Sequence, residues 1–111
     1  MNPAYVLVRS DELRPGPELV EYLRSVDDSL EQHGAKILVQ SFPAEVPLGT
    51  WDGFITLLQF PSLEQAQRWY ESPEYSAIRH LRVASSVPTD VIVPGVSSGH
   101  RSEHLLASLR G

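Results

Sequence analysis

The sequence contains no cysteine, which excludes disulfide bonds, thiolate nucleophiles and cysteine-ligated metals. It has nine lysine and arginine residues against fourteen aspartate and glutamate residues, for a formal net charge of -5. This acidic balance argues against nucleic acid or an anionic membrane as a partner. No apolar run approaches the roughly 20 residues of a membrane-spanning helix, and the chain opens into a strand-like YVLV instead of a signal peptide. We therefore expect a cytoplasmic protein that makes no membrane contacts.

Recognisable cofactor and metal motifs are also missing. The sequence has no glycine-rich phosphate loop and no dinucleotide-binding fingerprint. His100 and His104 are four residues apart and could hold a metal ion on a helix. However, HRSEH is not the HExxH motif, and no third ligand is evident. We expect neither a cofactor nor a metal.

The 111 residues fit one domain. Residues 4–9, 36–42, 53–60 and 89–93 are rich in β-branched and aromatic residues and read as strands. Residues 17–33 carry apolar residues at helical spacing between Pro17 and Gly34, and a second helical region follows Ser62. The order β-α-β-β-α-β predicts a ferredoxin-like α+β fold with a four-stranded antiparallel sheet. We expect this domain to occupy residues 1–95, with residues 96–111 forming a flexible tail or a short helix.

The stretch FPSLEQAQRWYESPEY predicts a break in the second helical region. Ser62 and Gln65 match the capping-box pattern, so a helix should begin there. Pro73 should end that helix, because its ring clashes with the preceding turn. Ser72 can then cap a new helix with Pro73 in its first turn. We expect this new helix to continue until Pro88 stops it.

The strands are apolar on both faces. Tyr5 and Leu7 point to the side opposite Val6 and Val8, and the strand at 36–42 has the same mixture, with Ile37 and Val39 expected on one face. A strand with one solvated face should alternate apolar and polar residues. Two helices cover only one face, so the sequence predicts a homodimer in which two sheets pack together. The alternative is that Leu105, Leu106 and Leu109 fold back over the open face.

The segments HGAKILVQ, GTW and QFPSLEQAQRWYESPEY, followed by Leu81-Arg82, resemble the domain-of-unknown-function 1330 family. The resemblance covers about residues 5–95. It implies the dimeric α+β barrel superfamily and a small cleft between the sheet and the helices. The chain departs from the family pattern at Ala35, and at Leu48 and Gln59, where the family usually has acids. A proton-transfer role for those two acids therefore does not carry over.

Tyr75 and Arg82 are the leading candidates for a catalytic site. They are seven residues apart and should lie on the same side of the expected helix. A guanidinium beside a phenol could hold a carboxylate or stabilise an enolate oxygen. The alternative is that Arg82 pairs with a surface acid such as Glu74 and Tyr75 packs in the core.

Other residues are candidates for transferring protons or for forming the apolar wall of a substrate-binding cleft. His33, at the end of the first helix, and His80 are the candidates for moving protons, although His33 also suits a helix C-terminus structurally. The substrate-binding candidates are Trp51, Tyr70, Tyr5 and Trp69.

Two functions remain open on the sequence alone. The first is a small cofactor-independent enzyme, an isomerase, cyclase or monooxygenase-like protein, that binds an oxygenated or acidic small molecule, aromatic or polyketide-like. The second is a non-catalytic ligand-binding or accessory homodimer. A purely structural dimer is the third and weakest hypothesis. The fold itself does not decide among the three, because relatives of one fold often differ in activity.

Overall fold

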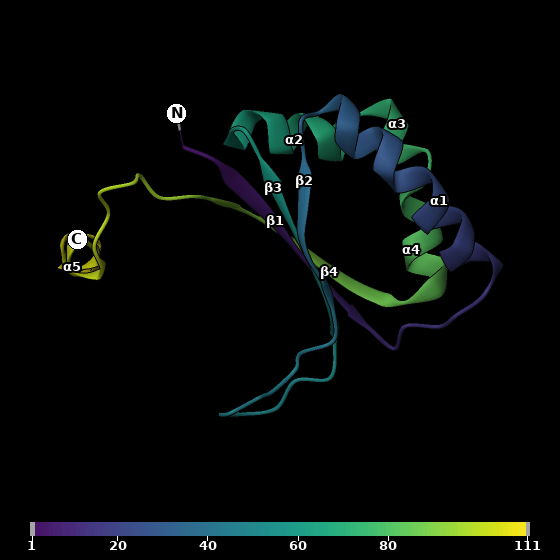
Figure 1. The fold of residues 1–111 in the computed structure, drawn as a ribbon, viewed down its shortest axis with the longest axis horizontal. Coiled ribbons are helices and arrows are strands. Elements are labelled where there is room, and N and C mark those ends of the chain that lie inside the picture. Colours follow the sequence, from purple (N-terminus) through teal and green to yellow (C-terminus); the bar gives the residue numbers. More distant parts are fainter. Residues whose placement is uncertain (1, 111) are drawn as a thin grey trace.

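The computed structural model describes residues 2–110 and contains a four-stranded antiparallel sheet with strand order β2-β3-β1-β4. Figure 1 shows helices α1 to α4 gathered on one side of this sheet. This is the predicted ferredoxin-like α+β fold. The strands are β1 (Ala4–Asp11), β2 (Lys36–Ser41), β3 (Phe54–Phe60) and β4 (Val87–Pro94). The helices are α1 (Pro17–Gln32), α2 (Leu63–Glu71), α3 (Pro73–Ser76), α4 (Arg79–Ser85), the short 3-10 helix η1 (Ser102–His104) and α5 (Leu105–Arg110).

The helix boundaries follow local capping chemistry. The Ser62 hydroxyl accepts a hydrogen bond from the backbone N–H of Gln65 at 3.2 Å, as the capping pattern predicts. The Ser72 hydroxyl accepts one from the backbone N–H of Tyr75 at 3.2 Å, so the predicted break and restart at Ser72-Pro73 are confirmed. Gly34 ends α1 with φ of 72°, a conformation that glycine adopts at little cost.

The prediction that one helix runs from Pro73 to Pro88 is wrong. The chain breaks again at Ala77 and Ile78, which separate α3 from α4. The backbone N–H of Ile78 donates to the carbonyl of Tyr75 at 3.0 Å, and such an i to i+3 bond tightens the last turn of a helix. Pro88 lies inside β4, which is an edge strand, where a missing N–H is tolerated.

A second correction concerns β2. Ile37 pairs with Leu58, on the face of the helices, whereas Val39 pairs with Leu57, on the opposite face. The two residues were expected to share a face. The pairing with β3 shifts between them, and such a bulge inserts one extra residue and inverts the alternation beyond it.

The hydrophobic core lies between the sheet and the helices. Strand β1 alternates strictly, and its buried residues Ala4, Val6, Val8 and Ser10 face the helices. The largest fully buried side chain is Trp69 of α2, which packs against Phe60 and Tyr75. This core fixes α2 and α3 on the sheet.

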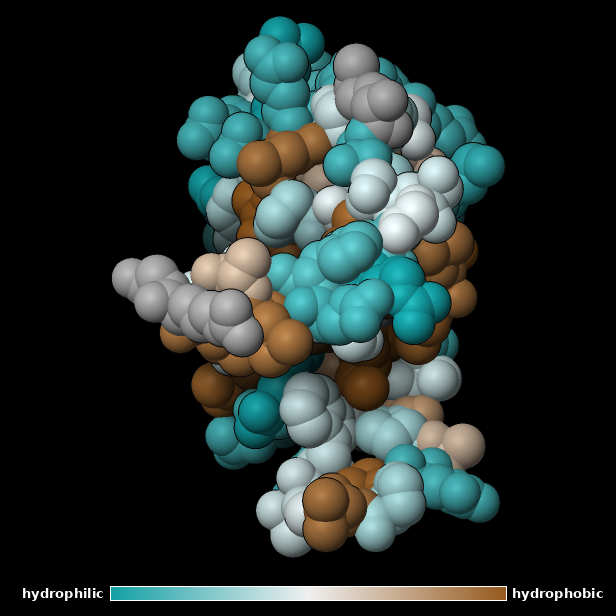
Figure 2. Space-filling model, turned by 90° about the vertical axis from the view of Figure 1, so that its left-hand side faces the viewer, coloured by the Kyte–Doolittle hydropathy of each residue, from teal (hydrophilic) through white to brown (hydrophobic). Residues whose placement is uncertain are grey.

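The opposite face of the sheet is apolar and uncovered. Leu7 of β1 is flanked by Leu57 of β3 and Val91 of β4, and Val91 and Val93 are exposed at 41% and 42%. Figure 2, seen from the side of the C-terminal segment, shows hydrophobic patches interrupted by hydrophilic residues. An exposed apolar sheet face is a common mark of an interaction surface.

The C-terminal segment does not provide that cover in the described part of the chain. Figure 1 shows α5 standing apart from the sheet at the end of an extended stretch. Leu105, Leu106 and Leu109 are exposed at 54%, 53% and 73%. The alternative in which these leucines fold back over the open face is therefore not the arrangement found. The division of the chain at Gly95 stays a prediction. Within residues 2–110, no helix combines the length and apolar character needed to cross a membrane.

Candidate functional site

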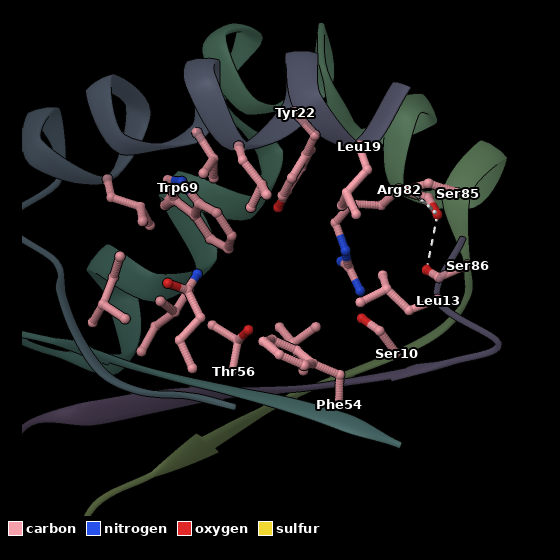
Figure 3. Close-up of a pocket in the computed structure, with 17 residues that line it drawn as sticks. Ser10, Leu13, Leu19, Tyr22, Phe54, Thr56, Trp69, Arg82, Ser85 and Ser86 are labelled. Atoms are coloured by element: carbon pink, nitrogen blue, oxygen red, sulfur yellow. Dashed lines mark hydrogen bonds between the residues drawn. The ribbon is translucent and has the colours of Figure 1, made fainter. Parts of the chain in front are cut away.

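A cavity of about 240 Å³ lies between α1, α4 and the sheet. Figure 3 shows Tyr22 reaching into it from α1, Arg82 from α4, Trp69 from one end, and Thr56 and Phe54 from the sheet. Most of the wall is apolar, contributed by Leu19, Leu23, Val26 and their neighbours. Ligand pockets in proteins are typically apolar with a few placed polar groups, and this cavity has that character.

A buried polar network closes one side of the cavity. Arg82 Nη1 donates to Asp90 Oδ2 at 2.7 Å and to the Tyr75 hydroxyl at 3.2 Å. The Tyr70 hydroxyl donates to the same Asp90 oxygen at 2.8 Å. The hydroxyls of Tyr22 and Tyr75 lie 3.0 Å apart and share a hydrogen bond. Four separate elements, α1, α2, α3 and α4, are thereby tied to β4.

Two polar atoms of this network lack hydrogen-bond partners within the described residues. They are Arg82 Nη2 and Asp90 Oδ1, and both are buried. The side chains of Arg82 and Asp90 are only 6% and 12% exposed. Buried polar atoms are normally satisfied, and an unsatisfied one needs a specific explanation. Arg82 also lines the cavity, so the unpartnered Nη2 lies close beneath its wall without being open to it.

Three side chains of the network, Tyr22, Tyr70 and Arg82, have raised pKa values. Burial raises the pKa of Tyr22 well above its usual value, and the neighbouring Tyr75 raises it further. Burial and the hydrogen bond to Asp90 also raise the pKa of Tyr70. Burial disfavours the charged form of Arg82, but the hydrogen bond to Asp90 and nearby groups outweigh this, so the pKa of Arg82 is raised. Near neutral pH, Tyr22 and Tyr70 are therefore phenols and Arg82 is a cation.

The sequence matches the model of a domain of unknown function, DUF1330, over residues 3–96. The chain belongs to the DUF1330 family. The resemblance noted in the sequence is therefore confirmed. Among the curated proteins, none matches this DUF1330 chain in sequence.

Solved structures similar to this DUF1330 protein share its fold at low identity. A protein of unknown function from Rhodopseudomonas palustris has a TM-score of 0.66 at 14% identity, with 86% of this chain and 84% of that chain covered. A dimeric ferredoxin-like protein of unknown function from Jannaschia sp. CCS1 has a TM-score of 0.60 at 14% identity, with 82% and 97% covered. A DABB-family protein with a ferredoxin-like fold from Mesorhizobium loti has a TM-score of 0.59 at 16% identity, with 89% and 100% covered. At such identities the likeness shows the fold alone.

The DUF1330 structure brings four of the predicted site residues together. Arg82 and Trp69 line the cavity. Tyr75 and Tyr70 belong to the network that holds Arg82. Tyr75 is fully buried in the core, as the alternative held. Its hydroxyl contacts the guanidinium across the break between α3 and α4, not along the single helix that the spacing argument assumed. The pairing of Arg82 with a surface acid is not what is found, since its partner is Asp90.

The other four candidates do not line this cavity. His33 lies at the end of α1, with Nε2 3.9 Å from Glu74 Oε2. Trp51 lies in the loop between β2 and β3, where the guanidinium of Arg9 stacks over its ring at 4.8 Å. Tyr5 is on the opposite face of the sheet, paired with Val93 and Gln59. His80 is exposed on α4.

The positions of the two missing family acids are also away from the cavity. Leu48 is 92% exposed in the loop between β2 and β3. The amide of Gln59 lies on the open face of the sheet, 3.5 Å from the Tyr5 hydroxyl. A carboxylate at either position would not reach Arg82 across the sheet.

The sequence analysis singled out neither Asp90 nor Tyr22 as a site residue. Asp90 could have been found from alternation. Asp90 is an acid in the strand TDVIV and shares a face with Ile92, whereas Val91 and Val93 share the other face. If the face with Ile92 packs against the helices, Asp90 is buried there with it. Within the described residues, no cluster of three or more potential metal-ligating side chains occurs.

Proposed function

We propose that this DUF1330 protein is a homodimer that binds a small oxygenated molecule in the cavity of each subunit. The observation that carries the proposal is Arg82, a buried cation that lines an apolar cavity and whose Nη2 has no hydrogen-bond partner within the described residues. Leaving such a group unpaired costs about 1–3 kcal/mol or more. A bound oxygen atom would recover that free energy.

The homodimer is supported by the open apolar face around Leu7. Burial of apolar area stabilises an interface by roughly 25 cal/mol per Å² before association entropy is subtracted. The similar protein from Jannaschia sp. CCS1 is described as dimeric. The sheet face would then become the dimer interface, and each helix layer would keep its own cavity.

We expect Leu7→Asp to convert the dimer to a monomer. Leu7 lies on β1, between Leu57 and Val91 of the neighbouring strands, so the new carboxylate would be buried in the interface without a partner. Sedimentation equilibrium at micromolar concentration should give twice the chain mass for the wild type and a single chain mass for the variant. Val83→Asp is the matched control, because Val83 is 61% exposed on α4. A monomeric wild type would contradict the prediction.

Ligand binding is tested by thermal shift against a panel of small phenols, hydroxy ketones and carboxylic acids. We expect hits that raise the melting temperature of the wild type and fail to do so for Arg82→Lys. Lysine keeps a cation beside Asp90 but has no second nitrogen for the ligand. Leu23→Trp, at a half-exposed position of the wall, should weaken the same hits by narrowing the cavity. Trp51→Phe, remote from the cavity, should leave them unchanged.

A cofactor-independent enzyme is the second candidate function. Arg82 favours it, because a fixed guanidinium beside a largely apolar cavity stabilises partial negative charge that develops on a carbonyl oxygen during enolisation. The lining residues include no histidine or carboxylate, so the proton would have to be moved by the substrate or by water. Because the described lining offers no such group to move a proton, we rank ligand binding above catalysis. Turnover of a thermal-shift hit by the wild type, lost in Arg82→Lys, would establish the enzyme.

A further inference from the structure

We propose that the cavity selects neutral ligands carrying both a carbonyl and a hydroxyl group, and discriminates against their carboxylate counterparts. This inference rests on the proposed binding function. It concerns the chemical class of the ligand, and the argument comes from the charges and hydrogen-bonding groups around Arg82.

Arg82 is the only charged residue among those that line the cavity. Its charge is already balanced by Asp90, whose Oδ2 lies 2.7 Å from Nη1 and whose side chain is only 12% exposed. The pair is therefore neutral as a unit. Arg79 is a further cation beside the network. Its guanidinium lies 4.8 Å from the ring centroid of Tyr70 and 6.0 Å from that of Tyr75, and it does not line the cavity. Its partial exposure lets water screen its charge.

A carboxylate bound to Arg82 would give this buried unit a net negative charge. Burying an ion without a compensating charge carries a large desolvation cost. The second carboxylate would also repel Asp90, since both would share one guanidinium. A carbonyl oxygen accepts the same hydrogen bond without either cost.

The serine hydroxyls beside Arg82 point to the same conclusion. Ser85 Oγ donates to the carbonyl of Leu81 at 2.8 Å, and Ser86 Oγ donates to the carbonyl of Arg82 at 2.9 Å. Their hydrogens are therefore in use, and what they offer a ligand is oxygen lone pairs. Figure 3 shows Ser10, Ser85 and Ser86 grouped at the Arg82 end of the cavity, with Trp69 at the other end.

At the polar end of the cavity, Arg82 supplies the one charged donor, and Ser85 and Ser86 supply hydroxyl acceptors. A ligand that matches it has an acceptor and a donor close together on an apolar body. A carboxylate has two acceptors and no donor. The volume of about 240 Å³ is just below the range of roughly 300–1,000 Å³ usual for drug-sized ligands, so the body is small, on the scale of one ring.

The test uses compounds of nearly the same size and shape that differ in charge, measured by isothermal titration calorimetry at pH 7. 2-Hydroxyacetophenone and salicylate share a ring and an ortho hydroxyl, and 2-hydroxybenzamide provides a second neutral member. We expect the neutral members to bind the wild type about tenfold more tightly or better, the difference that 1.4 kcal/mol produces. Asp90→Asn keeps an acceptor for Arg82 and Tyr70 but removes the balancing charge. It should abolish or reverse the preference.

A second measurement uses the wild type alone, so it tests the inference even if Asp90→Asn does not fold. 4-Nitrophenol ionises near neutral pH, so its affinity should fall as the pH rises through its own pKa. Tighter binding of salicylate than of the neutral pair by the wild type, or tighter binding of the nitrophenolate, would overturn the inference while leaving the proposed function intact. An unchanged preference in a folded Asp90→Asn would also overturn it. If no member of any pair binds the wild type, the proposed function falls with it.

Discussion

Arg82→Met is expected to lower the free energy of unfolding by about 3–5 kcal/mol, the cost typical of removing one partner of a buried ion pair. The variant leaves the Asp90 carboxylate buried, with Oδ1 already unpartnered and only the Tyr70 hydroxyl still donating to Oδ2. The Tyr75 hydroxyl also loses its contact with Nη1. Since small domains are stable by only about 5–15 kcal/mol, urea unfolding followed by circular dichroism should show a large shift in the midpoint.

The matched control and a double variant separate charge from packing. Arg68→Met removes an exposed pair with Glu64, in which the two side chains are 63% and 74% exposed, and should cost less than about 0.5 kcal/mol. Arg82→Met combined with Asp90→Asn removes both charges and should recover much of the loss. If Arg82→Met costs no more than the exposed control, the network does not hold the helices to β4.

The fold could be predicted because local signals and long-range pattern agree. Ser62 and Ser72 are serines placed before a helical repeat, and their hydroxyls form the expected caps. The contact between Tyr75 and Arg82 is also found, but it joins α3 to α4 and does not run along one helix. The break at Ala77 and Ile78 left no such signal, because neither residue is a breaker. It is set by how α3 and α4 pack, which the sequence does not state locally.

The site was predicted only in part, because its key acid lies far along the chain from its partners. Asp90 meets Arg82 and Tyr70 only when β4 lies beside β1 and α2 packs over it. The bulge between Ile37 and Val39 is another non-local feature, since it depends on the pairing of β2 with β3. The sequence could suggest that Tyr75 lies near Arg82, although the two meet between separate helices. It could not show that Asp90 balances the guanidinium, and the proposed preference for a neutral ligand depends on that balance.

Replacement of Trp69 is expected to have the second large effect on stability, and replacement of Trp51 a small one. Trp69→Ala should destabilise the protein by about 3–5 kcal/mol, the range for removing a buried aromatic side chain. Trp69 is 1% exposed, its ring lies 4.0 Å from that of Tyr75, and its Nε1 donates to the buried Ser29 hydroxyl at 3.1 Å. Loss of this ring also removes one wall of the cavity, so ligand binding should weaken even where the variant stays folded.

Trp51→Ala is the control, and it should cost about 1 kcal/mol or less. Trp51 contributes a stacking contact with Arg9 and a 2.8 Å hydrogen bond to the carbonyl of Gly53, and cation–π contacts at exposed sites are worth only about 0.5–1 kcal/mol. Each variant keeps one tryptophan, so fluorescence during urea unfolding reports separately on the core and on the loop. Because Trp69 reports from the core, its signal should change together with the circular dichroism. Equal destabilisation by the two variants would mean that the packing of α2 on the sheet is not what holds this side of the cavity in place.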